Sequence, residues 1–378
     1  MKTATLSLAV ISLLQLAVAQ PHRRHAHEAF HAKKDVTVRD DSNAARVIVY
    51  VDQNGNPVST TTQLPAAQTE APAVPSPTPE AAAPVVADKV ADTNPSSASS
   101  DSAPSASASS EPSTGGYGLT YSPYNKDGTC KTADQVLMDF DGFGSGYSTV
   151  RTYGIDCNTV STVVAAAKAH GMKVFQGIFD ITDIDGSVQE IVSAVNGDWS
   201  IIHTISVGNE LVNSGKSSAA SVVEAMSSAR TLLRAAGYNG PVVTCDTLVA
   251  TLENPSLCDN ADYCAVNSHP FFDSNTAAIS AGTFLTRSIE SLKSKLADSS
   301  QTVVITETGW PSKGNTNGLA IPSLLNQKVA ITAIKTAFLT APENVMLFNP
   351  YNMMWKTSNA DQFEAEQWWG FLGECPSG

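Results

Sequence analysis

Short runs of β-branched and aromatic residues alternate with helical stretches from residue 115 to residue 378. Eight such runs are predicted strands, at 117–121, 149–153, 173–179, 204–208, 241–244, 263–267, 302–306 and 344–348. Residues with helical spacing lie between several of them, at 159–170, 218–236, 284–296 and 324–339. A strand–helix alternation repeated eight times is typical of an α/β fold whose parallel strands close into a (β/α)₈ TIM barrel.

An open, doubly wound sheet is the alternative fold for the same alternation. That fold usually carries a glycine-rich phosphate-binding turn after its first strand, and no such turn follows residues 117–121. The segment 115–378 also holds all five Trp and all six Cys of the chain. Its length suits one barrel domain, so we predict a single barrel over 115–378.

The first residues have the pattern of a secretory signal peptide, which we assign to 1–19. Lys2 supplies a positive charge, residues 6–16 are apolar, and residues 17–19 offer a small-residue cleavage site. The apolar run is too short to span a bilayer comfortably, so a transmembrane anchor is the weaker interpretation. We therefore expect a secreted, extracellular protein that leaves the membrane once the signal is cleaved.

Residues 20–114 form a leader in two segments. Residues 20–58 begin with a His- and Arg-rich, propeptide-like stretch, for which metal binding is the less favoured interpretation. A strand pattern followed by an Asn-Gly turn then predicts a short hairpin, which is marginal in water by itself. Residues 59–114 are mainly Ser, Thr, Pro and Ala, a composition typical of a disordered, O-glycosylated linker.

Charge and cysteine content exclude some classes of partner. The formal charge is −13, from 23 Lys and Arg against 36 Asp and Glu, and an acidic protein repels the phosphates of nucleic acids. Six cysteines in an exported chain suggest disulfides, whose pairing the sequence leaves open; free buried thiols are the alternative. No Cys or His spacing suggests zinc, so we expect a monomer without a metal or cofactor.

Two glutamates stand at the carboxyl ends of predicted strands, where (β/α)₈ barrels carry their chemistry. Glu210 follows the fourth strand and Glu307 the seventh, and we expect these strands to reach the barrel mouth from opposed sides. Cleavage of a glycosidic bond needs two such carboxyls, one to protonate the departing oxygen and one to attack or stabilise the anomeric carbon. The sequence therefore predicts Glu210 and Glu307 as a catalytic pair.

Seven further side chains are candidates for binding the substrate: Tyr121, Tyr153, Asn209, Asn267, His269, Trp310 and Lys356. Aromatic faces suit sugar rings, with barrel core as the alternative position. Asn209 is expected to bond a sugar hydroxyl or to cap a loop. His269 contacts the substrate, a carboxylate or the core, and Lys356 either orients Glu307 or is a solvated loop lysine. Arg151 is expected to pair with a strand-end acid as structural support.

Several motifs resemble those of glycoside hydrolase family seventeen, the glucan endo-1,3-β-glucosidases and their fungal cell-wall relatives. They are VGNE at 207–210, ITETGWPS at 305–312, YGLTY at 117–121, VNSHPF at 266–271 and WK…EQWWG at 355–370. The leader looks like that of the soluble cell-wall subgroup. The resemblance implies a retaining enzyme that acts on β-1,3-glucan in the cell-wall matrix, with Glu210 as acid/base and Glu307 as nucleophile.

The resemblance leaves three functions open. Hydrolysis and transglycosylation share one glycosyl-enzyme intermediate and differ in the acceptor, so the sequence does not choose between them. A non-catalytic wall adhesin or antigen is the third, but a pure binding module needs no paired carboxylates. The segment 348–354 also lacks the acidic residue that relatives often place after the eighth strand, a departure that concerns the outer subsites.

Overall fold

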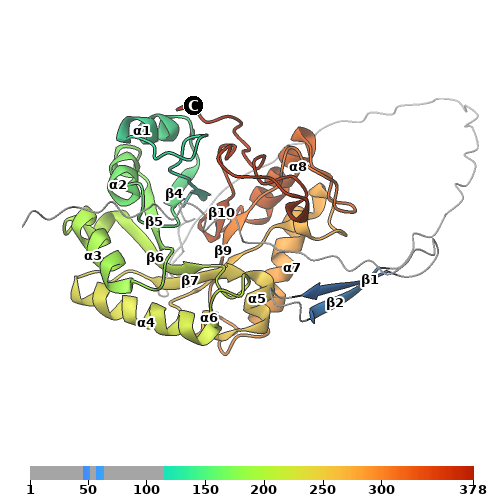
Figure 1. The fold of residues 1–378 in the computed structure, drawn as a ribbon, viewed down its shortest axis with the longest axis horizontal. Helices are drawn as coiled ribbons and strands as arrows, with labels where there is room; N and C mark the ends of the chain where they lie inside the picture. The colour runs from blue at the N-terminus through green and yellow to red at the C-terminus, as the bar shows by residue number, and fades with distance from the viewer. Residues whose placement is uncertain (1–45, 52–56, 64–114) are drawn as a thin grey trace, which may run out of the picture. The chain divides into compact units, whose positions relative to one another are not determined.

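The computed structural model describes residues 46–51, 57–63 and 115–378. Eight strands of the last segment close into a barrel in the order β10-β3-β4-β5-β6-β7-β8-β9, and every neighbouring pair is parallel (Figure 1). The barrel strands are β3 (Tyr117–Thr120), β4 (Tyr147–Arg151), β5 (Lys173–Ile178), β6 (Ile202–Asn209), β7 (Val242–Thr247), β8 (Cys264–Asn267), β9 (Val303–Thr308) and β10 (Val345–Leu347). Each predicted strand is found within a few residues, and the (β/α)₈ fold is confirmed.

Helices alternate with these strands along the chain (Figure 1). They are α1 (Ala133–Asp141), α2 (Thr159–Ala169), α3 (Ile184–Val195), α4 (Ala219–Ala235), α5 (Leu248–Glu253), α6 (Ser256–Asp259), α7 (Ala281–Lys293) and α8 (Leu324–Ala337). The four predicted helices correspond to α2, α4, α7 and α8. Gly171 and Gly237 follow α2 and α4 with φ angles of +65° and +91°, a conformation that glycine adopts readily just after a helix. Among the described helices, none is long and apolar enough to cross a membrane.

The order of the strands decides where the two glutamates meet. β6 and β9 stand three places apart around the ring, with β7 and β8 between them, so they do not face each other from opposed sides as expected. The end of β8, Asn267, therefore lies between the ends of the two strands that carry Glu210 and Glu307. All six residues of β9 are buried, as is usual for parallel strands covered by helices.

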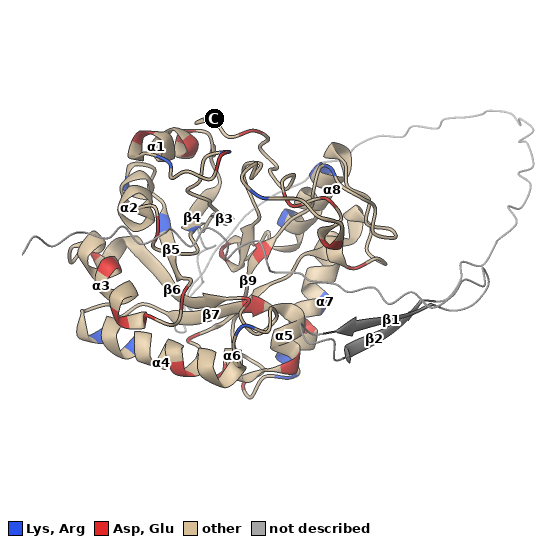
Figure 2. Ribbon diagram, viewed as in Figure 1, with Lys and Arg blue, Asp and Glu red and all other residues tan. Residues whose placement is uncertain are grey.

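Charged side chains of both signs share the helical surface. Acidic residues lie on α1, α3 and α4, and basic residues lie on α2 and α4 (Figure 2). The excess of acidic residues is therefore spread over several helices.

The six cysteines all lie in the described residues. Cys130 is bonded to Cys157, and Cys258 to Cys264, which confirms that the chain contains disulfides and supplies the pairing that the sequence left open. The remaining two, Cys245 and Cys375, are free thiols.

The hairpin of the leader is a separate compact unit. β1 (Arg46–Val51) pairs antiparallel with β2 (Pro57–Gln63). β2 ends at Gln63 rather than at residue 58, where we drew the boundary between the hairpin segment and the linker. The predicted signal peptide, the His-rich stretch and most of the linker lie outside the described residues.

Candidate active site

Glu210 and Glu307 are brought together by a third residue. Both are 6% exposed. The amide nitrogen of Asn267 donates hydrogen bonds to Glu210 Oε1 at 2.8 Å and to Glu307 Oε1 at 3.0 Å. Two oxygens bonded to one nitrogen lie no more than about 6 Å apart, whereas retaining glycosidases hold their carboxyls about 5–5.5 Å apart and inverting ones about 6.5–9.5 Å apart. The geometry therefore fits the retaining class.

An irregular strand end aims Glu210 into this site. The pairing of β6 with β7 shifts register between Ser206 and Asn209. Within that interval Gly208 has a φ of +79°, and Glu210 itself has a φ of +52°. Non-glycine residues seldom adopt this left-handed conformation, and such positions recur at functional sites. Bulges of this kind redirect side chains beside active sites, which explains how Glu210 reaches Asn267.

Arg151, the last residue of β4, connects the groups beneath the carboxyls. One guanidinium nitrogen, Nη1, donates to Glu307 Oε1 at 2.8 Å and to Asn267 Oδ1 at 3.1 Å. The other, Nη2, donates to Asn209 Oδ1 at 2.7 Å. Arg151 is 1% exposed, so the expected pairing with a strand-end acid is confirmed as a buried ion pair. A buried charge needs such partners, because burying it alone is costly.

The surroundings shift the acidities of the two glutamates in opposite directions. Burial, and next the negative charge of Glu307, raise the pKa of Glu210 to about 8. Burial by itself would raise the pKa of Glu307 as well, but the charge of Arg151 and the contact with His269 outweigh it and lower the pKa to about 2. At neutral pH Glu210 is therefore protonated and Glu307 ionised. Two carboxyls with divergent pKa values are the usual mark of a general acid beside a nucleophile.

Two more predicted residues lie against Glu307. His269 Nε2 is 3.5 Å from Glu307 Oε2, and its ring packs edge-on against Trp369. Tyr153 lies near the same carboxylate: burial and then the charge of Glu307 raise the pKa of its hydroxyl well above the ordinary value. With Asn209 and Asn267, four of the seven predicted binding residues gather around the two carboxyls.

Trp310 and Tyr121 do not join this group. Trp310 is fully buried, donates its indole N–H to the Ile321 carbonyl at 3.1 Å and packs on Phe271. The chain after β9 folds this ring into the core, which is the alternative position given for these aromatic side chains. Tyr121 is 3% exposed and donates its hydroxyl to Asp139 at 2.7 Å, so its phenol belongs to the packing around α1.

Lys356 lies in a largely buried ion pair rather than in solvent. Its ammonium lies 2.8 Å from Glu366, and both side chains are largely buried, so it is not a solvated loop lysine. It does not bond Glu307 directly, although its charge helps to lower the pKa of that carboxyl. Glu366 was missed by the sequence analysis, since a partner ten residues away in an irregular loop follows no periodic pattern.

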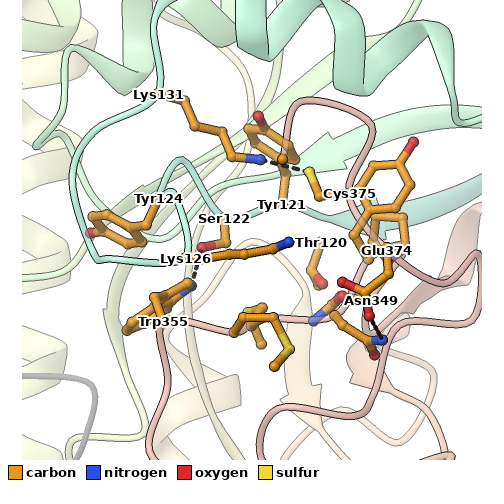
Figure 3. Close-up of a pocket in the computed structure, with 16 residues that line it drawn as sticks. Thr120, Tyr121, Ser122, Tyr124, Lys126, Lys131, Asn349, Trp355, Glu374 and Cys375 are labelled. Atoms are coloured by element: carbon orange, nitrogen blue, oxygen red, sulfur yellow. Dashed lines mark hydrogen bonds between the residues drawn. The ribbon is translucent and has the colours of Figure 1, made fainter.

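A pocket opens beside the barrel mouth, between the end of β3 and the loop after β10 (Figure 3). In its wall Trp355 donates its indole N–H to Ser122 Oγ at 2.9 Å and meets the ring of Tyr124 edge-on. Asn349, 4% exposed, also lines it, and neither atom of its amide bonds a partner among the described residues. This buried amide follows β10, in the segment that lacks the expected acid.

Metal ligation has no visible basis in this part of the chain. Among the described residues, no group of three or more His, Cys, Asp and Glu side chains is placed to hold an ion.

Comparison with known families matches residues 118–370 to the BtgE/BtgC glycoside hydrolase domain. The match includes both glutamates and all eight barrel strands, apart from the first residue of β3.

Among curated proteins, the chain is similar to the probable family 17 glucosidase SCW10 of Saccharomyces cerevisiae. The two are 44% identical over 260 residues, which is 68% of this chain and 65% of SCW10. It is also 40% identical over 258 residues to the cell surface mannoprotein MP65 of Candida albicans, covering 68% of this chain and 66% of MP65. The chain thus spans less than two thirds of the length of either relative.

Solved structures share the fold at lower identity. A β-1,3-glucanosyltransferase of Rhizomucor miehei, an active-site mutant in complex with laminaritriose, is 20% identical with a TM-score of 0.54, covering 68% of this chain and 93% of the other. CJP38, a β-1,3-glucanase and allergen of Cryptomeria japonica pollen, is 17% identical with a TM-score of 0.52, covering 68% and 95%. At such identities the likeness shows the barrel fold alone.

Proposed function

The chain belongs to the BtgE/BtgC glycoside hydrolase family, and from that premise we propose that it cleaves β-1,3-glucan with retention of configuration. Its predicted relation to family seventeen is confirmed. The observation that carries the proposal is the carboxyl pair joined through Asn267, with Glu210 protonated and Glu307 ionised at neutral pH. The relatives' printed names, a family 17 glucosidase and a glucanosyltransferase, support the substrate class.

Each carboxyl acts in a different half of the reaction. In the first half Glu307 attacks the anomeric carbon while Glu210 donates its proton to the departing glycosidic oxygen. In the second half the ionised Glu210 takes a proton from the acceptor, which attacks the covalent intermediate and releases Glu307. Arg151 holds Glu307 in its ionised form at the start. The pKa of Glu210 falls once Glu307 is esterified, because the neighbouring negative charge is gone.

The molecule that attacks the covalent intermediate decides whether the enzyme is a hydrolase or a transglycosylase. Water gives hydrolysis, and the end of a second glucan chain gives transglycosylation. The pocket lined by Asn349, Tyr124 and Trp355 contains a buried amide without a protein partner among the described residues, and we propose that this amide bonds one polar group of the sugar chain.

We propose the cell wall as the place of action and the monomer as the active form. The signal-peptide pattern of 1–19 supports secretion. The relative named as a cell surface mannoprotein supports a position at the wall. Assignment of Tyr153, Asn209 and His269 to substrate contacts belongs to the same proposal.

Product analysis tests the proposal. The purified chain is incubated with laminari-oligosaccharides labelled at the reducing end, and the products are separated by size. Shorter products alone indicate hydrolysis, and products longer than the substrate indicate transfer. No change in any oligosaccharide, with the protein folded, would favour the adhesin instead.

Variants of the two glutamates test their roles. Glu210→Ala should lose about 100- to 10,000-fold in rate on natural glucan but retain activity on substrates with good leaving groups. Azide should rescue this variant with retained configuration, since it attacks the covalent intermediate. Glu307→Ala forms no intermediate, so azide should yield an inverted product from an α-glycosyl fluoride. The reverse stereochemistry would exchange the two roles.

A further inference from the structure

A lysine, an aspartate and a free thiol form a cluster under the C-terminal tail, apart from the two glutamates. Lys131 precedes α1 and Cys375 lies near the end of the chain (Figure 3). Asp139 lies in α1. Lys131 is 6% exposed and Asp139 is fully buried. The Cys375 thiol donates to Asp139 Oδ1 at 2.9 Å, and the Lys131 ammonium lies 2.5 Å from Asp139 Oδ2.

The contact between the lysine and the thiol is unusually close. Lys131 Nζ lies 2.7 Å from Cys375 Sγ. Typical N–H···O hydrogen bonds span about 2.9–3.0 Å, and sulfur is larger than oxygen, so a hydrogen bond to sulfur should be longer still. A nitrogen and a sulfur bonded to the same oxygen atom are held about this close.

Cys375 has no cysteine within the chain to pair with. Four of the six form the two disulfides, and Cys245 is buried among β-strand residues of the barrel. Meanwhile Asp139 fixes the tail, because its Oδ1 also accepts the backbone N–H of Ser377 at 3.2 Å. The thiol is thus held against the Lys131 amine, half-buried, with Lys131 as its nearest nucleophilic neighbour among the contacts described.

We propose that Lys131 and Cys375 are a modification site, joined by a covalent nitrogen–oxygen–sulfur bridge when the protein meets dioxygen. The Cys375 S–H bond and one N–H bond of the neutral Lys131 amine break, and S–O and O–N bonds form. One oxygen atom of dioxygen becomes the bridge, and the other leaves as water with the two hydrogens. Sulfur and nitrogen are each oxidised by two electrons, and dioxygen takes up the four. Asp139 accepts and relays protons between the two groups.

The bridge would tie the tail to the segment that also carries the Cys130–Cys157 disulfide. Lys131 and Cys375 both line the pocket beside the barrel mouth, so the link would close one part of its wall. Thiol reductants reverse it: four electrons and four protons return the thiol, the amine and one water. The inference does not depend on the proposed glycosidase activity.

Peptide mass spectrometry of the full chain, purified in air and digested without reductant, tests the bridge. We expect three joined peptides, because the peptide that contains Lys131 also contains Cys130, which is bonded to Cys157. Their mass should be the sum of the three with one oxygen atom more and four hydrogen atoms fewer, two lost in the disulfide and two in the bridge. Dithiothreitol should release all three peptides and make Cys375 alkylatable. Complete alkylation of Cys375 before reduction would overturn the proposal. So would oxygen added to Cys375 alone, a link without oxygen, or a Cys375-linked dimer.

Two cysteine variants provide matched controls. Cys375→Ser keeps a hydrogen-bonding group beside Asp139 but cannot be bridged, so the peptide of residue 375 should separate while the Cys130–Cys157 pair remains. Cys245→Ser removes the other free thiol and should leave all three peptides joined. Reductant should lower the Tm of the unvaried protein more than that of Cys375→Ser, since the disulfides are common to both. Equal shifts in Tm would contradict a structural bridge.

Discussion

Glu210 keeps its proton far above the ordinary range of a glutamic acid, and this sets the pH dependence of the reaction. With a pKa of about 8 for Glu210 and about 2 for Glu307, the reactive state persists between these values. We expect kcat/KM on glucan oligosaccharides to fall only as pH rises through about 8. A substrate whose leaving group departs without protonation should show a much weaker alkaline decline. A decline centred near the ordinary pKa of glutamate would contradict the assignment.

The raised pKa of Glu210 also predicts that the folded protein becomes less stable as pH rises. The folded chain holds the Glu210 proton more tightly than the unfolded chain, whose pKa is near the ordinary value of 4.5. This contribution to the free energy of unfolding is therefore fully present below pH 4.5 and is lost as pH rises from there through about 8. Glu210→Gln cannot ionise. Its Tm relative to the parent should rise between pH 4.5 and 8, and a difference independent of pH would refute the argument.

The sequence predicted the carboxyl pair better than its surroundings, for a physical reason. Strand ends converge at the barrel mouth, so residues such as Glu210 and Glu307 can be placed from strand positions alone. Trp310 and Lys356 lie in irregular segments beyond a strand, where no periodicity tells which way a side chain points. The role of Asn267 as the bridge depends on β8 lying between β6 and β9, which follows only from the closed ring.

At the scale of elements, strands were easier to predict than helices. Short β-branched runs mark all eight strands because parallel strands are buried on both faces. α1 and α3 were not predicted. Three of the nine residues of α1 are Asp, whereas Val188, Ile191 and Val195 of α3 form a buried stripe at helical spacing that the sequence already contains. α1 is instead marked by its capping box, in which Thr132 and Gln135 bond each other's backbone N–H groups.

The two disulfides join neighbouring elements over loops of different length. Cys130–Cys157 spans 27 residues and Cys258–Cys264 only 6. Closing the longer loop in the unfolded chain stabilises the fold by about 3.5 kcal/mol, against about 2 kcal/mol for the shorter one. Replacing both cysteines of the first pair by Ser should therefore lower the midpoint of denaturant unfolding more than the same change in the second. The reverse order would mean that native contacts, not chain entropy, set the difference.

At the scale of the whole molecule, we expect the barrel to be active without the leader. The carboxyls, their hydrogen-bond partners and the pocket all belong to 115–378. Deleting residues 20–114 should thus leave kcat/KM on soluble laminari-oligosaccharides unchanged within about twofold, since no interaction at the reacting bond is removed. Activity on intact walls is the comparison, because there we expect the leader to extend the reach of the barrel. A large loss on the soluble substrate would show that the leader assists the barrel.

The pairing of β10 with β3 joins the last strand of the barrel to the first. Until Val345–Leu347 exists, β3 and β9 are open edges. Arg151 ends β4 and Glu307 lies in β9, so the two residues stand on opposite sides of the position that β10 fills, although they are 156 residues apart in sequence. A nascent polypeptide therefore contains both glutamates before the ring that sets Arg151 beside Glu307 can close. We expect the ion pair that keeps Glu307 ionised to form only after residues 345–347 have been synthesised and have paired with β3.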